Sequence, residues 1–177
     1  IGGRFAWEVR DVGGTKVLAK VLDALIRQRS QTFIGHPAMR DYTVIADVMS
    51  DGNRRLMSDV GVINQRYLIT LKGTWQQIEI SSNFERIRVN VPFKWQPGKW
   101  YRLMARVDVD GSGKAMVRAK AWARGEPEPA GWAIEVPHAH GHTHGSPGVF
   151  GFAPDARFRV YVDNVQVTPN AASAAAK

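Results

Sequence analysis

The sequence contains no cysteine among its 177 residues. This absence excludes disulfide bonds, thiolate metal sites and cysteine nucleophiles. The chain also lacks any run near the roughly 18 consecutive apolar residues of a membrane-spanning helix, so no transmembrane segment is predicted. No signal peptide is recognisable, and the chain begins at Ile1 rather than at methionine. We therefore expect a processed protein or an excised fragment.

Motifs of common enzyme classes are missing as well. There is no P-loop, no G-x-S-x-G nucleophile elbow and no E-x-D-x-x-E strand motif of the sandwich-type glucanases. A glycoside hydrolase needs two positioned carboxyl groups. Glu126 and Glu128 lie among prolines in GEPEP, which is a rigid turn, and Glu79 is isolated on its segment. We therefore predict that the chain is not an enzyme.

Positive charge dominates what is present. The chain has 24 Lys and Arg against 16 Asp and Glu, a formal net charge of +8. Such an excess favours acidic partners: a polyanionic glycan, an anionic membrane surface or an acidic protein. Compact Lys/Arg runs and aromatic-glycine RNA-binding segments are both missing, so no nucleic-acid partner is predicted.

Alternating apolar and polar residues fill most of the chain. In residues 101–109, Tyr101, Leu103 and Ala105 alternate with polar side chains, and a second alternating run covers 115–123. A period of two indicates β-strands. Asp110-Gly111 between the runs is typical of a hairpin turn. This hairpin would have one apolar face and one basic face that carries a tryptophan.

Similar patterns predict strands along the whole sequence. They cover residues 4–10, 16–22, 42–49, 60–65, 67–72, 75–81, 86–91, 133–136, 148–153 and 158–168. Residues 23–30 fit one helical turn or a loop. About twelve short strands with almost no helix predict an all-β fold, a two-sheet antiparallel β-sandwich of jelly-roll type. We expect a single domain over residues 1–169 and a flexible alanine-rich tail over 170–177.

Outward-facing polar residues suggest a binding surface. If the strands between Val60 and Arg124 were sequential neighbours, their polar sides would form one face. The candidate ligand-binding residues on it are Gln77, Glu79, Arg88, Arg102, Arg106, Arg118, Lys120 and Trp122, with Gln65 and Arg86 beside them. Arginine and tryptophan suit the carboxylates and rings of a glycan. Alternatively, the face is merely solvated, or it docks onto another protein domain.

Two segments raise the question of metal binding. His138, His140, His142 and His144 stand at every second position in HAHGHTH, where imidazoles of a flexible loop could converge on Zn²⁺ or another divalent metal. The alternative is a solvated polar loop. Asp108 and Asp110, next to Gly111 and Gly113, offer oxygen ligands for Ca²⁺. A hairpin turn also explains every residue of that second motif.

Three segments resemble a known domain. They are DVGVINQRYLITL (59–71), KWYRLMARV with VRAKAWARGEPEPAGW, and GSPGVFGF with FRVYVDNVQVTP. The chain is similar there to the C-terminal domain of exported bacterial proteins with a pyrroloquinoline-quinone-type β-propeller, a concanavalin A-like, laminin-G-like jelly roll. The most specific pattern is formed by Trp122, Gly125, Glu126, Glu128, Pro129 and Trp132. The resemblance implies export, a two-sheet sandwich and a non-catalytic accessory role.

These observations lead to one functional expectation and two alternatives. We expect a non-catalytic binding module, periplasmic or extracellular, that engages a glycan or an acidic protein surface without a cofactor. The first alternative is a structural accessory subunit that docks onto a larger periplasmic or membrane-associated complex. The second, a glycan-active hydrolase, has less support in the sequence. Other subunits or domains of an exported assembly are the expected protein partners.

Overall fold

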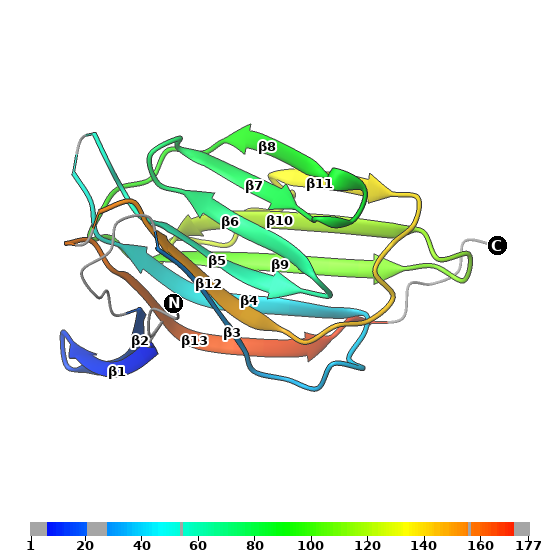
Figure 1. The fold of residues 1–177 in the computed structure, drawn as a ribbon, viewed down its shortest axis with the longest axis horizontal. Coiled ribbons are helices and arrows are strands. Elements are labelled where there is room, and N and C mark those ends of the chain that lie inside the picture. The colour runs from blue at the N-terminus through cyan, green and yellow to red at the C-terminus, as the bar shows by residue number, and fades with distance from the viewer. Residues whose placement is uncertain (1–6, 21–27, 54, 156, 172–177) are drawn as a thin grey trace.

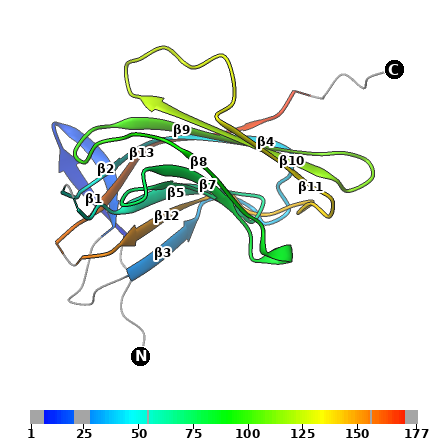
Figure 2. The same cartoon turned by 90° about the horizontal axis from the view of Figure 1, so that it is seen from above.

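The computed structural model of the protein describes residues 7–20, 28–53, 55–155 and 157–171. In these residues the chain forms two antiparallel sheets that pack face to face (Figures 1 and 2). Figure 1 looks onto a six-stranded sheet, and a seven-stranded sheet lies behind it. The predicted all-β sandwich is therefore confirmed. Within the described residues, no helix is long and apolar enough to cross a membrane.

The two sheets take alternate parts of the chain. The six-stranded sheet has the order β3 (Gln28–Phe33), β12 (Gly148–Ala153), β5 (Asp59–Asn64), β6 (Tyr67–Lys72), β7 (Gln77–Ser81) and β8 (Arg88–Pro92). The seven-stranded sheet has the order β1 (Trp7–Val12), β2 (Thr15–Lys20), β13 (Val160–Pro169), β4 (Tyr42–Ser50), β9 (Tyr101–Val109), β10 (Ala115–Ala123) and β11 (Ile134–His138). A short 3-10 helix, η1 (Phe84–Arg86), joins β7 to β8.

Period-two patterning explains the core. On β9 the residues Tyr101, Leu103, Ala105 and Val107 are buried, and the residues between them are only half-buried. On β6 and β7 the inward set includes Ile69, Leu71, Ile78 and Ile80, all 0% exposed. Burial of these side chains from two facing sheets removes apolar surface from water and is the main force that holds the sandwich together.

One polar side chain ties the sheets across this core. The side-chain amide of Asn64, at the end of β5, donates to the backbone oxygen of Tyr42 at 2.8 Å and to that of Ala105 at 3.0 Å. Tyr42 and Ala105 belong to the seven-stranded sheet. Asn64 is fully buried, so these hydrogen bonds replace water for its side-chain nitrogen and fix the two sheets relative to each other.

Differences from the predicted elements are local. Strand β3 occupies residues 28–33, where the sequence suggested a helical turn or a loop over 23–30; residues 23–27 lie outside the described residues, as do 4–6 and 21–22 of the first two predicted strands. β3 was missed because QRSQTF has almost no apolar alternation; it forms by pairing with β12. The predicted tail begins with Asn170, which is not loose: its backbone N–H donates to the Asp41 oxygen at 2.8 Å.

Close packing of β5 against β6 depends on Gly61. A Cβ atom at this position would lie 2.2 Å from the backbone oxygen of Ile69, and that oxygen cannot move without breaking the strand pair. We expect Gly61→Ala to lower the free energy of unfolding by about 2 kcal/mol, measured by urea denaturation. The control is Gly111→Ala, because nothing lies within 4 Å of its added Cβ; equal effects would contradict the prediction.

Candidate functional site

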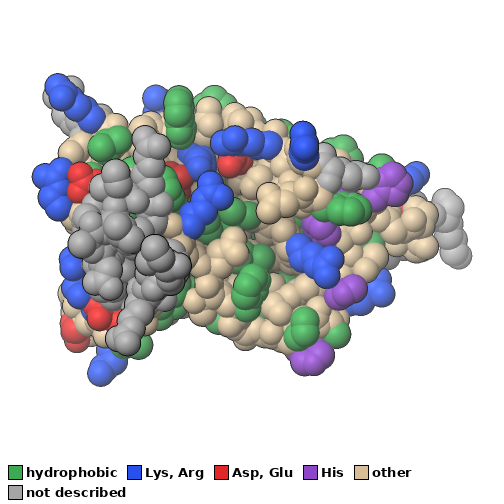
Figure 3. Space-filling view, in the orientation of Figure 1, with side chains coloured by type: hydrophobic (Ala, Val, Ile, Leu, Met, Phe, Trp, Pro, Cys, Tyr) green, Lys and Arg blue, Asp and Glu red, His purple; other side chains and the backbone are tan. Residues whose placement is uncertain are grey.

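The outer face of the six-stranded sheet carries a hollow of about 480 Å³. We call it the groove. Its described lining residues come from β3, the turn between β5 and β6, β6, β7, β8, β12, and η1 with its flanking residues: Arg29, Gln31, Arg66, Leu68, Thr70, Lys72, Glu79, Ser81, Ser82, Asn83, Arg86, Ile87, Arg88 and Phe150. The space-filling view in Figure 3 shows this side of the molecule, with Lys and Arg side chains over the sheet. The groove is therefore open, polar and rich in cations.

The described residues neutralise only part of the charge in the groove. Five of its described lining residues are cationic and one, Glu79, is anionic. Arg88 Nε lies 2.8 Å from Glu79 Oε2, and Lys72 Nζ lies 2.6 Å from Asp59 Oδ2. The three remaining cations, Arg29, Arg66 and Arg86, are exposed and form no ion pair with any described residue. Their unpaired charges favour an anionic ligand.

Two of these arginines sit on strained backbone. Arg66 has φ 71° and Arg86 has φ 53°, both in the left-handed region that non-glycine residues rarely adopt. Each such residue costs roughly 1–3 kcal/mol, and strain of this kind clusters at functional sites. Arg66 follows Gln65, which is also left-handed at φ 46°, and together they form the two-residue turn between β5 and β6. The turn thus holds a guanidinium at the groove.

Titratable side chains lie on the groove floor and directly beside it. Lys72 on β6 and Glu79 on β7 belong to the outward-facing rows of paired strands, in which Thr70 is opposite Glu79. Burial raises the pKa of Asp59, although Lys72 and the Gly73 N–H counteract this shift. The hydrogen bond to Glu79 raises the pKa of Arg88. These pairs supply a carboxylate and an ammonium on adjacent strands, the kinds of group that exchange protons with a substrate.

The predicted single binding surface does not form. Gln77, Glu79 and Arg88 lie on the six-stranded sheet, whereas Arg102, Arg106, Arg118, Lys120 and Trp122 lie on the seven-stranded sheet. The two sets therefore belong to the two separate sheets of the sandwich, which Figure 2 shows from above. The prediction fails because β8 and β9, which follow each other in sequence, belong to different sheets. Gln65, expected outside, is fully buried.

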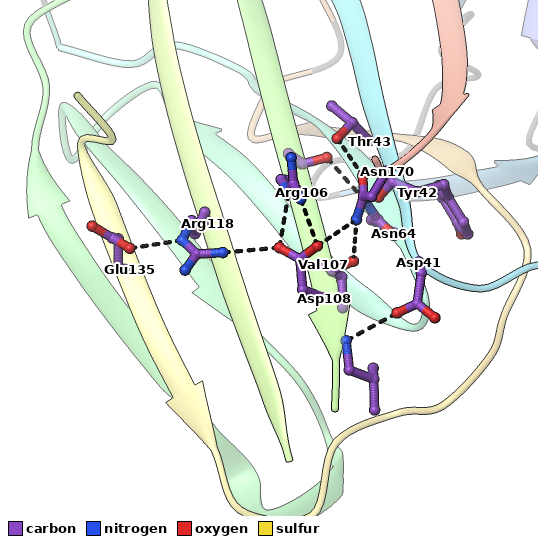
Figure 4. A network of polar contacts seen from close by, with 12 residues as sticks. Asp41, Tyr42, Thr43, Asn64, Arg106, Val107, Asp108, Arg118, Glu135 and Asn170 are labelled. Carbon is purple, nitrogen blue, oxygen red and sulfur yellow. Dashed lines mark hydrogen bonds and ion pairs between the residues drawn. The ribbon is translucent and has the colours of Figure 1, made fainter. Parts of the chain in front are cut away.

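Arg106 and Arg118 on the seven-stranded face are paired with carboxylates of the protein. Asp108 accepts hydrogen bonds from Arg106 at 2.7 and 2.8 Å, from Arg118 at 2.8 Å and from Asn170 at 2.9 Å (Figure 4). Arg118 also donates to Glu135 at 2.7 Å. Because its carboxylate is engaged in this way, Asp108 is no free calcium ligand. Asp110 likewise binds Ser112 and the Lys114 N–H within the hairpin turn.

Two more clusters on this face are structural. Lys120 Nζ lies 2.6 Å from Glu128, 2.7 Å from the Pro129 oxygen and 4.9 Å from the ring centre of Trp132. These contacts hold the 124–133 turn, and Trp122 beside them is only 8% exposed. The buried Asp47 accepts from Arg102 at 2.9 Å. Compared with the groove, this face therefore offers a ligand little unpaired charge.

The four histidines of HAHGHTH separate into two pairs. His138 and His142 are buried, with ring centres 5.9 Å apart, whereas His140 and His144 are exposed. Tyr67 Oη lies 2.6 Å from His138 Nδ1, and Ser82 Oγ lies 2.7 Å from His142 Nε2. No group of three or more His, Asp or Glu side chains in the described part of the chain is arranged to hold a metal ion. The predicted metal site is therefore not assembled.

Sequence reasoning found part of the groove and missed the rest. It named Glu79, Arg88 and Arg86 as outward residues, and all three line the groove. It missed Lys72, although the outward position of Lys72 follows from the alternation over residues 67–72. Arg66 in the turn and Arg29 on β3 gave no such signal, because the first lies between strands and the second lies on a strand without alternation.

Comparisons with known proteins support the fold. No protein-family model and no curated protein matches the sequence. Among solved structures, the chain is similar to an endo-β-1,4-glucuronan lyase from the fungus Trichoderma reesei, with a TM-score of 0.61, 12% identity and coverage of 95% of this chain and 88% of that one. It is also similar to a marine PL-14 alginate lyase from Aplysia kurodai, with a TM-score of 0.57, 10% identity and coverage of 94% and 87%.

These neighbours correct the functional expectation. We expected a non-catalytic module, either a binding module or an accessory subunit, and no enzyme. The same two-sheet sandwich, over nearly its whole length, occurs in two polysaccharide lyases. The expectation was wrong because it rested on missing hydrolase motifs and a missing second carboxylate, and elimination chemistry requires neither. The comparisons support the jelly-roll sandwich and no specific link to β-propeller proteins.

A buried histidine gives the fold a testable pH dependence. Burial, with Arg66 and His138 nearby, lowers the pKa of His142 to about 4, below its ordinary value of 6.5. The unfolded chain therefore binds a proton at higher pH than the folded chain does. His142 therefore makes its full contribution to the free energy of unfolding above pH 6.5. This contribution decreases as the pH falls towards 4, by at most about 3 kcal/mol.

The measurement is urea unfolding across this pH range. We expect His142→Gln to show a flatter pH profile than the wild type between pH 6.5 and 4. His144→Gln is the matched control, since the His144 ring is exposed, and it should keep the wild-type profile. Identical profiles for His142→Gln and the wild type would rule out His142 as the source.

Proposed function

We propose that the protein is a polysaccharide lyase that cleaves an acidic, uronate-containing glycan in the groove of the six-stranded sheet. One observation carries the proposal: Arg29, Arg66 and Arg86 line the groove without an ion pair to any described residue, whereas Arg102, Arg106, Arg118 and Lys120 on the opposite face are paired with carboxylates. A polyanionic chain would supply the missing counter-charges. The fold shared with a glucuronan lyase and an alginate lyase supports this choice of reaction.

Elimination fits the groove better than hydrolysis. Glycoside hydrolases use two carboxyl groups that flank the scissile bond, and among the described lining residues only Glu79 carries a carboxylate. Elimination from a uronate instead needs a cation beside the sugar carboxylate and groups that accept and donate one proton. The groove provides arginines for the first task and Glu79 and Lys72 for the second.

The proposed roles follow from charge. Arg88 is 67% exposed at its side chain and pairs with Glu79, so a uronate carboxylate can take over Arg88 and release Glu79. Glu79 then removes the proton at C5 of the uronate, and the arginines stabilise the negative charge that develops. The C4–O bond breaks, the leaving oxygen takes a proton from Lys72, and a C4–C5 double bond remains. No water is consumed.

The proposed place of action is periplasmic or extracellular, where a polymeric glycan is accessible. The segments that resemble the C-terminal domains of exported β-propeller proteins support export. Proximity to a membrane surface and contact with other subunits of an exported assembly stay predictions, and a native pull-down from the source organism would check them.

The reaction class is tested by the product. On glucuronan or alginate we expect an increase in ultraviolet absorbance, because elimination leaves an unsaturated uronate at each new non-reducing end. Cellulose and other neutral glucans serve as controls and should give no signal. New reducing ends without ultraviolet absorbance would show hydrolysis instead, and the absence of both signals on a panel of acidic polysaccharides would contradict the proposal.

A matched pair of variants tests the location. Arg88→Gln removes a cation from the groove, and Arg102→Gln removes a cation that pairs with Asp47 on the opposite face. A charge-assisted hydrogen bond contributes about 1.5–3 kcal/mol, so we expect Arg88→Gln to lower kcat/KM roughly 10- to 100-fold. Arg102→Gln should retain wild-type kcat/KM per folded molecule, as judged by circular dichroism. Equal losses would place the activity outside the groove.

A further inference from the structure

A second hollow of about 260 Å³ adjoins the groove. Its described lining residues are Phe33, Pro37, Arg66, His144, Gly145 and Ser146. Arg66 lines both hollows, so the second one lies next to the groove at the turn between β5 and β6. Figure 3 shows histidine side chains gathered at one end of this side of the molecule.

The lining of the second hollow suits a sugar ring. Phe33, at the end of β3, is 58% exposed although it is a large apolar side chain. Pro37 and the exposed His144 lie with it around the hollow. An aromatic ring packs against the C–H face of a pyranose, and the nearby guanidinium of Arg66 can bind a carboxylate of the same sugar or of its neighbour.

Hydrogen bonds hold this hollow in shape. The Ile34 N–H donates to the Pro147 oxygen and the Gly145 N–H to the Met39 oxygen, both at 2.9 Å. The buried hydroxyl of Tyr42 donates to the Gly145 oxygen at 2.8 Å. The loops on either side are thus fixed to each other and to the core. A site that is built in advance loses little conformational entropy on binding.

We propose that the second hollow is a distal subsite that binds a sugar unit of the same acidic polysaccharide chain, outside the units at the point of cleavage. The inference rests on the proposed function. Its consequence is that the substrate is a long polyanion, which binds along a path from Arg88 over Arg66 to Phe33. Two observations support this occupant: Arg66 lines both hollows, and it forms no ion pair with any described residue.

Chain-length dependence tests the subsite. Phe33→Ala should lower kcat/KM on the polymer roughly three- to tenfold, the effect of a lost aromatic contact. It should leave kcat/KM on a trisaccharide unchanged, because the proposed subsite binds a sugar unit outside those at the point of cleavage. Trp75→Ala is the matched control: Trp75 is 71% exposed and lines neither hollow. Equal effects of Phe33→Ala on both substrates, or none on the polymer, would overturn the subsite.

A binding measurement separates this inference from the proposed function. Affinity electrophoresis in gels that contain glucuronan or alginate needs no turnover, and a Glu79→Gln background prevents loss of the polymer. We expect Phe33→Ala and His144→Ala to migrate faster than the parent and Trp75→Ala to match it. That pattern in a protein without lyase activity would refute the reaction and keep the subsite. Unchanged retardation of both variants would refute the subsite even if elimination were observed.

Discussion

The turn at Gln65 and Arg66 links the stability of this sandwich to its groove. Its first residue is fully buried: the Gln65 N–H donates to Tyr42 Oη at 3.0 Å, and its side-chain amide donates to the His142 oxygen at 2.7 Å. Its second residue lines both hollows. Both adopt left-handed backbone, a cost that the hydrogen bonds of Gln65 and the Asn64 tie between the sheets offset. Core and groove therefore depend on the same few residues.

The two outer faces differ in how their charge is used. On the seven-stranded sheet, arginines and lysines hold carboxylates and turns in place, and one of these carboxylates, Asp108, accepts a hydrogen bond from Asn170. On the six-stranded sheet, three arginines have no partner among the described residues, and the floor pairs have one member within reach of a ligand. Even paired, exposed charges contribute little to stability, and cations that lie close together repel one another. The three arginines therefore do not stabilise the fold. In the proposed function, these arginines bind the anionic ligand.

The groove residues differ in whether the sequence could identify them. Outward positions on regular strands, such as Glu79 and Arg88, follow from the alternation of residues 75–81 and 86–91. Arg29 could not be found in this way because β3 owes its structure to pairing with β12, and propensity alone does not predict such a strand. Arg102 and Trp122 looked equivalent to Arg88 in the sequence. Their place on the other sheet, and the burial of Trp122, distinguish them from Arg88 and are not visible in the sequence.

The sequence by itself determined the all-β class, most strand positions, the hairpin at Asp110-Gly111 and the excess of positive charge. These follow from local rules: a period of two, turn residues and composition. Only the tertiary structure decided which strands share a sheet, because strand pairing joins segments that lie far apart in the chain. That pairing placed five cations in one groove, paired Arg102, Arg106, Arg118 and Lys120 with carboxylates on the opposite face, and separated four neighbouring histidines into a buried and an exposed pair.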